Sequence, residues 1–217
     1  MSNFETVSIV QAAQRNSEDR VAVVEKDDLL LIVVADGAGG MGGGDVAAEM
    51  VIREVTASAA QLRDAESCCE LLRQIDFRVG AGQSTAVIAC VARAGVFGAS
   101  VGDSQAWLIR EGEVLNLTHA QVRKPLLGSG ECRPVAFSSG QLDSLLLVCT
   151  DGLANYVKRP DLVRLAALAE FSELPRKLVE MVRLPSGELW DDVGLVLCRR
   201  RRPSPRRKRY NVAEGLF

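Results

Sequence analysis

The sequence predicts a layered α+β fold in which blocks of antiparallel strands alternate with pairs of helices. Apolar runs of strand length are separated by short turns, and two groups of segments between them show helical spacing of apolar residues. This order is typical of layered α+β proteins and differs from the strand–helix alternation of a doubly wound parallel sheet. The chain has 217 residues, 47% of them hydrophobic, which is enough for one domain with a sizeable core.

The N-terminal third is expected to contain three strands and two helices. Strands at 7–10 and 21–24 flank a polar turn, and the uninterrupted apolar run at 29–35 indicates a central strand covered on both faces. After a glycine-rich turn, Asp45 is the expected N-cap of the first helix. A second helix is expected over 65–77. The apolar stripe of the first helix consists of Ala47, Met50, Val51, Val55 and Ala59.

The rest of the body is expected to contain short strands followed by three helices and a last strand. Short connections between the first of these strands predict antiparallel neighbours. The expected strands are 84–91, 96–101, 105–109, 114–117, 144–149 and 193–198, and the expected helices are 153–156, 160–169 and 174–182.

Charge is distributed unevenly along the chain. From Arg199 onward there are eight Lys or Arg residues and one acid, so this end carries +7 and the preceding body −9. An acidic body argues against general nucleic-acid binding. We therefore expect one folded domain over 1–200 and a basic, disordered tail over 201–217, either solvated or docked on the body, or else bound to an anionic partner.

The six cysteines and the hydropathy pattern indicate a cytoplasmic protein. None of the cysteines forms a Cys-x-x-Cys pair, and several lie in apolar strand-like runs, which favours a reducing compartment. No run of about 18 apolar residues and no signal-peptide pattern is present, so neither a membrane span nor secretion is expected.

Acidic residues stand where the expected strands begin or end, beside glycines or turns. Each one alone is explained by turn formation. If the strand ends converge, however, the carboxylates share a cleft and would take up protons unless hard cations neutralise them. Oxygen ligands of this kind suit Mg²⁺ or Mn²⁺, and two such ions could activate water for attack on phosphorus without a covalent intermediate. The residues are Glu18, Asp19, Asp36, Asp103, Asp151, Asp191 and Asp192.

Two further features bear on the chemistry. Arg15 lies close to Glu18 and Asp19 and could bring a guanidinium to a phosphate, although a surface arginine is an equal alternative. The segment 37–42 formally satisfies the dinucleotide motif G-x-G-x-x-G. That motif alone is weak, and an aspartate just before its first glycine would repel a pyrophosphate.

Six ordered blocks resemble the metal-dependent serine/threonine protein phosphatases of the 2C type, in their short bacterial form. The match spans about 7–198. The blocks are 15–19, 34–40, 82–86, 101–106, 150–153 and 191–192.

The resemblance implies a four-layer α-β-β-α sandwich of two antiparallel sheets flanked by helix pairs. It implies hydrolysis of phosphoserine and phosphothreonine in proteins by water activated at a binuclear Mg²⁺ or Mn²⁺ centre, with a third, looser ion in bacterial-type members. The partner would be a phosphoprotein in signalling, opposing a serine/threonine kinase. We expect a monomer that binds neither a membrane nor a specific nucleic acid.

The resemblance also implies roles for individual residues. Asp36 would bridge the two catalytic metals, Gly37 would supply its carbonyl oxygen to one of them, and Arg15 would bind the phosphate. The other implied metal residues are Asp151 and Asp191 at the second ion, Glu18 and Asp19 acting on its shell through water, and Asp103 with Asp151 at the third ion.

The chain departs from the family pattern in three places. An alternative interpretation is a catalytically silent module that binds or regulates a phosphoprotein, and it is supported by the short flap segment, the basic tail and the altered loop at Ala38 and Met41. Ala38 stands where animal members often carry a histidine. The segment between His119 and Leu145 leaves little room for a substrate-shaping flap. Asp192 replaces the usual asparagine and competes with Asp191 for the ligand role. Every expected metal position nevertheless holds an acid, which favours an active enzyme. His119 is expected to be structural.

Overall fold

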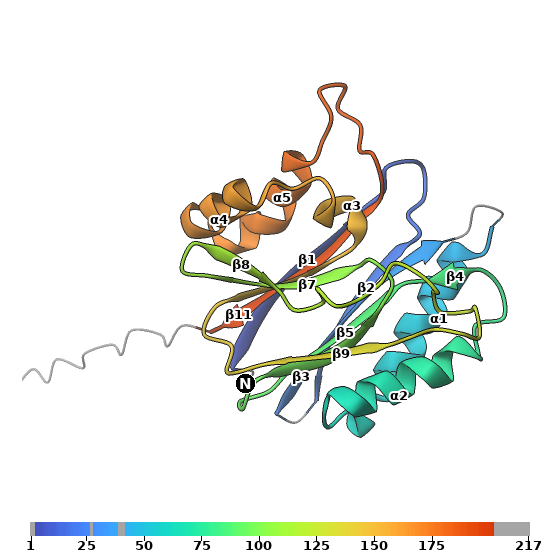
Figure 1. The fold of residues 1–217 in the computed structure, drawn as a ribbon. Coiled ribbons are helices and arrows are strands. Elements are labelled where there is room, and N and C mark those ends of the chain that lie inside the picture. Colours follow the sequence, from blue (N-terminus) through green and yellow to red (C-terminus); the bar gives the residue numbers. More distant parts are fainter. Residues whose placement is uncertain (1–2, 27, 39–41, 202–217) are drawn as a thin grey trace, which may run out of the picture.

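Two antiparallel sheets face each other, and helices cover their outer sides (Figure 1). The computed structural model describes residues 3–26, 28–38 and 42–201. One sheet has the order β1-β11-β10-β7-β8. Its strands are β1 (Phe4–Gln11), β11 (Val193–Arg200), β10 (Leu145–Cys149), β7 (Gln105–Arg110) and β8 (Glu113–Asn116).

The second sheet has the order β2-β3-β5-β6-β9, with a short extra strand paired to β3. Its strands are β2 (Asp19–Lys26), β3 (Leu29–Ala38), β5 (Ala86–Val91), β6 (Val96–Val101) and β9 (Val135–Ser139), and the extra strand is β4 (Gln83–Ser84). Every strand pair is antiparallel within the described residues. The predicted α+β sandwich is confirmed, and a parallel dinucleotide-binding sheet is excluded.

The helices form the two outer layers. Helices α1 (Gly44–Ala57) and α2 (Ala65–Asp76) lie on the second sheet. Helices α3 (Asp151–Ala154), α4 (Arg159–Leu168) and α5 (Leu174–Met181) lie on the first. Single 3₁₀ turns at Ala59–Gln61 and Phe171–Glu173 complete these layers. No helix in the described part of the chain is long and apolar enough to cross a bilayer.

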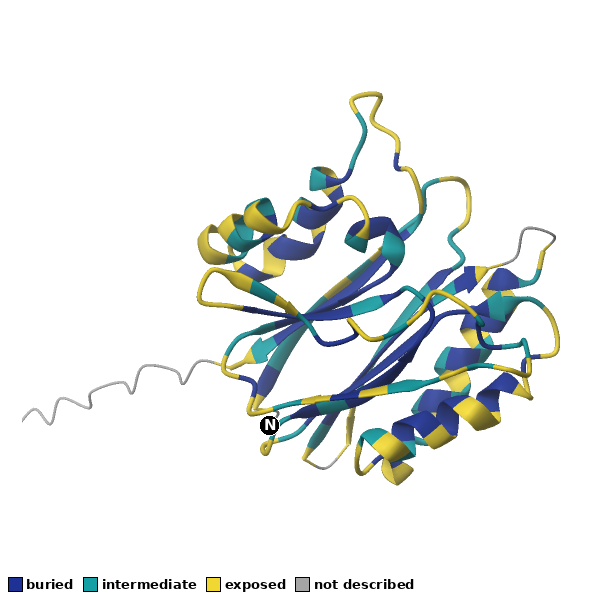
Figure 2. Cartoon of the chain, viewed as in Figure 1, coloured by how far each residue is buried: buried dark blue, intermediate teal, exposed yellow. Residues whose placement is uncertain are grey.

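Three apolar layers hold the sandwich together, and β3 takes part in two of them. Side chains alternate along a strand, so Leu31 and Val33 pack toward α1 and α2 while Ile32 and Val34 pack between the sheets. On the other side, Leu147 of β10 packs against α4 and α5. Figure 2 shows this pattern as buried strands between helices whose outer faces are exposed. The uninterrupted apolar run of β3 therefore reflects burial on both faces.

Several element predictions need correction. The short connection after β6 does not form a hairpin, because β6 and β7 belong to different sheets and the chain crosses between them at Gly102. Helix α1 begins two residues earlier than expected, with Gly43 as N-cap at φ 98°, and Asp45 lies in its first turn. The edge strand β9 was not predicted, because Phe137 is its only buried residue.

The final strand is also longer than predicted and includes the first basic residues of the chain end. Arg199 forms an ion pair with Glu5 of β1, and its guanidinium lies 4.3 Å from the ring centroid of Phe171. Arg201 donates its backbone N–H to the Asn3 carbonyl at 2.8 Å. The predicted disordered tail spans 201–217; of these residues Arg201 is described, and 202–217 lie outside the described residues.

Candidate active site

A cavity of about 440 Å³ opens where the strand ends of both sheets meet. Five acidic side chains from five separate segments line it, together with Gly37 and Ala38. Two basic side chains, Arg123 and Lys124, also line it. With all of these groups ionised, the lining carries a formal charge of −3. The acids are Glu18, Asp36, Asp103, Asp151 and Asp191.

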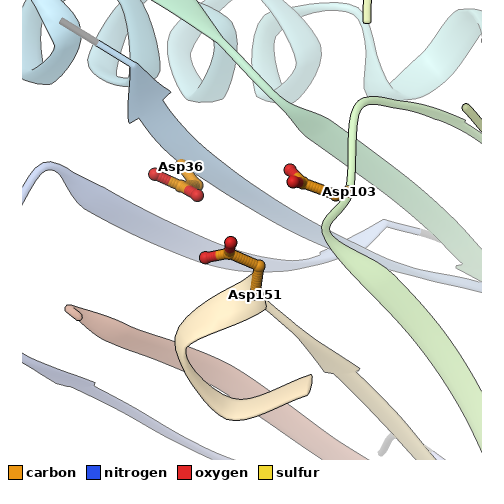
Figure 3. A group of neighbouring side chains, drawn as sticks. All are labelled: Asp36, Asp103 and Asp151. Carbon is orange, nitrogen blue, oxygen red and sulfur yellow. The ribbon is translucent and has the colours of Figure 1, made fainter. Parts of the chain in front are cut away.

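Three of the acids converge closely. One carboxylate oxygen from each of Asp36, Asp103 and Asp151 lies within 4.8 Å of the others. Figure 3 shows their side chains pointing toward a common space from the end of β3, the crossover after β6 and the start of α3. Among the described residues this is the only such group. A larger hollow of about 520 Å³ lies beside the β7–β8 turn, but no comparable cluster of acids lines it among the described residues.

Hydrogen bonds from Thr85 fix the position of Asp36. The Thr85 backbone N–H donates to the Asp36 carbonyl at 2.8 Å, and the Asp36 N–H donates to the Thr85 hydroxyl at 3.0 Å. That hydroxyl lies 2.7 Å from the hydroxyl of Ser104, which follows Asp103. The network therefore couples the end of β3 to the crossover that carries the second acid.

Burial and mutual repulsion raise the pKa values of the clustered acids. Burial raises the pKa of Asp36 to about 9, and the charges of Asp19 and Asp151 add to the shift. Burial also raises the pKa of Asp151 to about 6, with further contributions from Asp103 and Asp191. The pKa of Glu18 is raised by burial and by Asp45. Each shift reports a carboxylate with too little neutralising charge around it.

These residues fit divalent cations. All the candidate ligand atoms are carboxylate oxygens. Among the described residues, Arg123 is the one basic group that forms an ion pair with a carboxylate of the cluster. No side-chain donor in the described chain bonds the Asp36 carboxylate. Such a partly buried set of oxygens with little compensating charge suits Mg²⁺ or Mn²⁺ better than zinc, which prefers nitrogen and sulfur ligands.

Asp19 lies beneath the cavity and does not line it. Its side chain is 1% exposed and accepts a hydrogen bond from the Thr150 hydroxyl at 2.8 Å. Asp19 is the direct cross-strand partner of Asp36, so its charge acts on that residue from below. Burial raises the pKa of Asp19 to about 7, an effect that the Thr150 hydrogen bond opposes.

The two neighbouring acids before β11 occupy different surroundings. Asp191 lines the cavity. Asp192 instead accepts backbone N–H bonds from Ala13 and Glu18, each at 2.7 Å, and so ties down the loop between β1 and β2. Its carbonyl oxygen would lie 1.9 Å from a Cβ added at Gly152, so only glycine permits this contact with α3.

Arg15 is exposed in the β1–β2 loop and is not among the residues lining the cavity. It makes no hydrogen bond or ion pair with any described residue. The cavity instead contains Arg123 and Lys124, which sequence reasoning missed. Little in the sequence indicated this role, because both residues lie between His119 and Leu145, a segment that stood out only because it is short. His119, also outside the cavity, places Nδ1 3.0 Å from the Asn116 carbonyl oxygen.

Asp76, another residue that was missed, anchors the loop that carries Arg123. Its buried carboxylate accepts backbone N–H bonds from Gly128, Ser129 and Gly130 at 2.7 to 3.1 Å, and from Cys132 at 2.9 Å. Four donors converging on one carboxylate hold a segment without regular secondary structure in place.

The raised pKa values predict how the free energy of unfolding depends on pH when EDTA keeps the protein free of metal. Where a folded acid keeps a proton that the unfolded chain releases, the free energy of unfolding falls as pH rises, by about 1.4 kcal/mol per unit for each such group. We expect a fall from about pH 4, with Asp151 contributing up to about pH 6, Asp19 to about pH 7 and Asp36 to about pH 9. Denaturant unfolding in EDTA across this range measures it.

The control for this pH dependence is Asp36→Asn, which removes the group that titrates highest. The variant is expected to show a much shallower fall above pH 7. Parallel stability curves for the two proteins between pH 7 and pH 9 would contradict the assignment of that proton to Asp36.

Comparisons with known proteins identify the family and agree with the fold. The family model for protein phosphatase 2C matches residues 10–183. No curated protein matches the sequence.

Solved structures match the fold closely at low sequence identity. The S. agalactiae serine/threonine phosphatase has a TM-score of 0.79 at 17% identity, covering 91% of this chain and 100% of that one. Stp1 of Staphylococcus aureus has a TM-score of 0.76 at 20% identity, covering 93% and 96%. The catalytic domain of PstP, solved with two manganese ions, has a TM-score of 0.72 at 19% identity, covering 90% and 97%. With its family model matched over most of its length, this chain belongs to the protein phosphatase 2C family.

Proposed function

We propose that this protein is a metal-dependent phosphatase that hydrolyses phosphoserine and phosphothreonine in proteins. The observation that carries the proposal is the convergence of acids from five segments on one cavity, three of them with carboxylate oxygens within 4.8 Å. Family membership and the fold of serine/threonine phosphatases support the substrate class. The two manganese ions in PstP support a binuclear centre here.

The proposed ligand set uses the groups that border the cavity. Asp36 would bridge two ions, and the Gly37 carbonyl would bind one of them. Asp151 and Asp191 would hold the second ion. Glu18 and the buried Asp19 would act on its shell, and Asp103 with Asp151 would hold a third. When bound, Mg²⁺ or Mn²⁺ would supply Lewis acidity toward the phosphate and lower the pKa of water.

The chain's own residues account for positioning and for metal dependence. The hydrogen bonds of Thr85 hold Asp36 in place, and the Thr150 hydroxyl holds Asp19. Without cations, the negatively charged lining repels a phosphate dianion, so binding of the substrate would itself depend on the metal. Ala38 borders the cavity and has no titratable group, so the protein offers no proton donor there for the leaving oxygen.

We further propose that residues 1–200 form the catalytic domain and act as a monomer on a phosphoprotein whose phosphate a serine/threonine kinase has added. The six cysteines are all free, which supports a reducing, cytoplasmic setting.

Hydrolysis of p-nitrophenyl phosphate with Mn²⁺ or Mg²⁺, compared with EDTA, tests the proposal. We expect turnover that EDTA abolishes and that Asp151→Asn reduces strongly, because this change removes a negative charge from the proposed ligand set. Activity that persists in EDTA would contradict the proposal. Absence of turnover on this substrate and on phosphothreonine peptides would favour the silent binding module. Faster hydrolysis of a phosphotyrosine peptide would contradict the substrate class.

A further inference from the structure

Arg123 brings a guanidinium into the acidic cavity and keeps part of it free. Its Nε lies 2.7 Å from Oδ2 of Asp103, and its side chain is 76% exposed. The two terminal nitrogens of the guanidinium make no interaction with any other described residue. Its Nε is therefore held by a carboxylate, while its terminal nitrogens remain available on a residue that lines the cavity.

The loop geometry keeps this guanidinium at the cavity. Four residues after Arg123, Leu127 pairs with Ser84, donating and accepting backbone hydrogen bonds of 3.0 and 3.1 Å. The Asp76 carboxylate then holds the next turn through four backbone N–H groups. Lys124 and Leu126, on the same segment, also border the cavity. The loop thus forms one wall of the site.

The charge of the site makes a basic group here chemically useful. A phosphate dianion entering between five carboxylates meets a net negative lining when no cation is bound. Divalent cations at the acids would remove that repulsion, and a guanidinium on the cavity wall would add hydrogen-bond donors for phosphate oxygens that the ions do not contact. An arginine can bind two phosphate oxygens at once, which a lysine cannot do with the same geometry. Arg15, the arginine expected from the motif, is exposed and outside the cavity.

We propose that Arg123 binds the phosphate group of the substrate and that Asp103 orients its guanidinium for this role. The proposal rests on the phosphatase function proposed above. Arg123 takes the part that the sequence motif gives to Arg15, and the short loop after β8 thereby supplies a substrate contact at the cavity wall.

The test compares four variants at saturating Mn²⁺: Arg123→Ala, Arg123→Lys, Arg15→Ala and Arg110→Ala. Arg110 is a matched control, since it also pairs with an aspartate, Asp143 at 3.6 Å, but lies outside the cavity. The readouts are KM and kcat for p-nitrophenyl phosphate, the calorimetric Kd of inorganic phosphate, and thermal unfolding.

We expect Arg123→Ala to raise the Kd of inorganic phosphate and the KM by at least about tenfold. Arg123→Lys should recover part of the loss because it keeps the charge but not the two-pronged geometry. Arg15→Ala and Arg110→Ala should bind phosphate as the native protein does. Thermal unfolding should change little in all four, which separates loss of the phosphate contact from collapse of the loop.

Native-like phosphate binding by Arg123→Ala would overturn the proposal, and a loss confined to Arg15→Ala would return the role to that residue. If the native protein shows no metal-stimulated turnover, the phosphatase function fails on its own, while the calorimetric comparison still decides the role of Arg123. Absence of any phosphate binding by the native protein would overturn this role as well.

Discussion

Replacing Asp36 by asparagine is expected to lower Mn²⁺-dependent hydrolysis of p-nitrophenyl phosphate by about 10²- to 10³-fold. Its carboxylate lies with those of Asp103 and Asp151 at the centre of the acidic cluster and would bridge the two ions. The amide keeps the shape of the side chain but removes a negative charge, which weakens the hold on both cations. Steady-state kinetics across a Mn²⁺ titration measure the loss.

The same substitution is expected to stabilise the metal-free protein. Burial and neighbouring acids raise the pKa of Asp36 to about 9, so at pH 7.5 folding requires proton uptake at this site. Asparagine removes that requirement, and the free energy of unfolding in EDTA should rise by on the order of 2 kcal/mol. Unchanged activity, or lower stability in EDTA, would contradict the role given to Asp36.

Substitutions of Asp191 and Asp192 are expected to affect different properties, metal binding for Asp191 and stability for Asp192. Asp191→Ala should weaken Mn²⁺ binding by about 10- to 100-fold with little loss of stability, because its side chain borders the cavity and is exposed. Asp192→Ala should instead cost about 2 kcal/mol of stability, because the backbone N–H groups of Ala13 and Glu18 lose their acceptor. Calorimetric Mn²⁺ titration and denaturant unfolding separate the two effects.

Asp192→Asn is the matched control for the second effect, because an amide oxygen can still accept one of the two bonds. It should fall between the native protein and Asp192→Ala in stability. If Asp192→Ala abolished Mn²⁺ binding while Asp191→Ala left it intact, the ligand assignment would have to be exchanged.

The fold could be predicted where local pattern and tertiary role agree. The apolar run of β3 indicated a central strand because burial on both faces leaves no polar alternation. The crossover after β6 could not be predicted, since Gly102 makes a tight turn whether the chain folds back or passes to the other sheet. Phe137, a lone buried residue in β9, gives too little pattern to identify an edge strand.

The acidic residues of the site that lie at strand ends could be predicted from the sequence. Acids beside glycines at those ends indicated a shared cleft, and the structure brings five of them to one cavity. The roles of Asp76 and Asp192 could not be predicted, because each bonds backbone groups far away in the sequence. The position of Arg123 likewise depends on an irregular loop whose path is set by tertiary hydrogen bonds.

Anomalous diffraction from crystals grown with Mn²⁺ tests the central claim most directly. We expect two strong manganese peaks in the cavity, one on each side of the Asp36 carboxylate and one of them contacted by both Asp151 and Asp191. A third, weaker peak is expected beside Asp103. Fully loaded crystals with no manganese between Asp36 and Asp151 would contradict the account, however closely the fold matches that of its relatives.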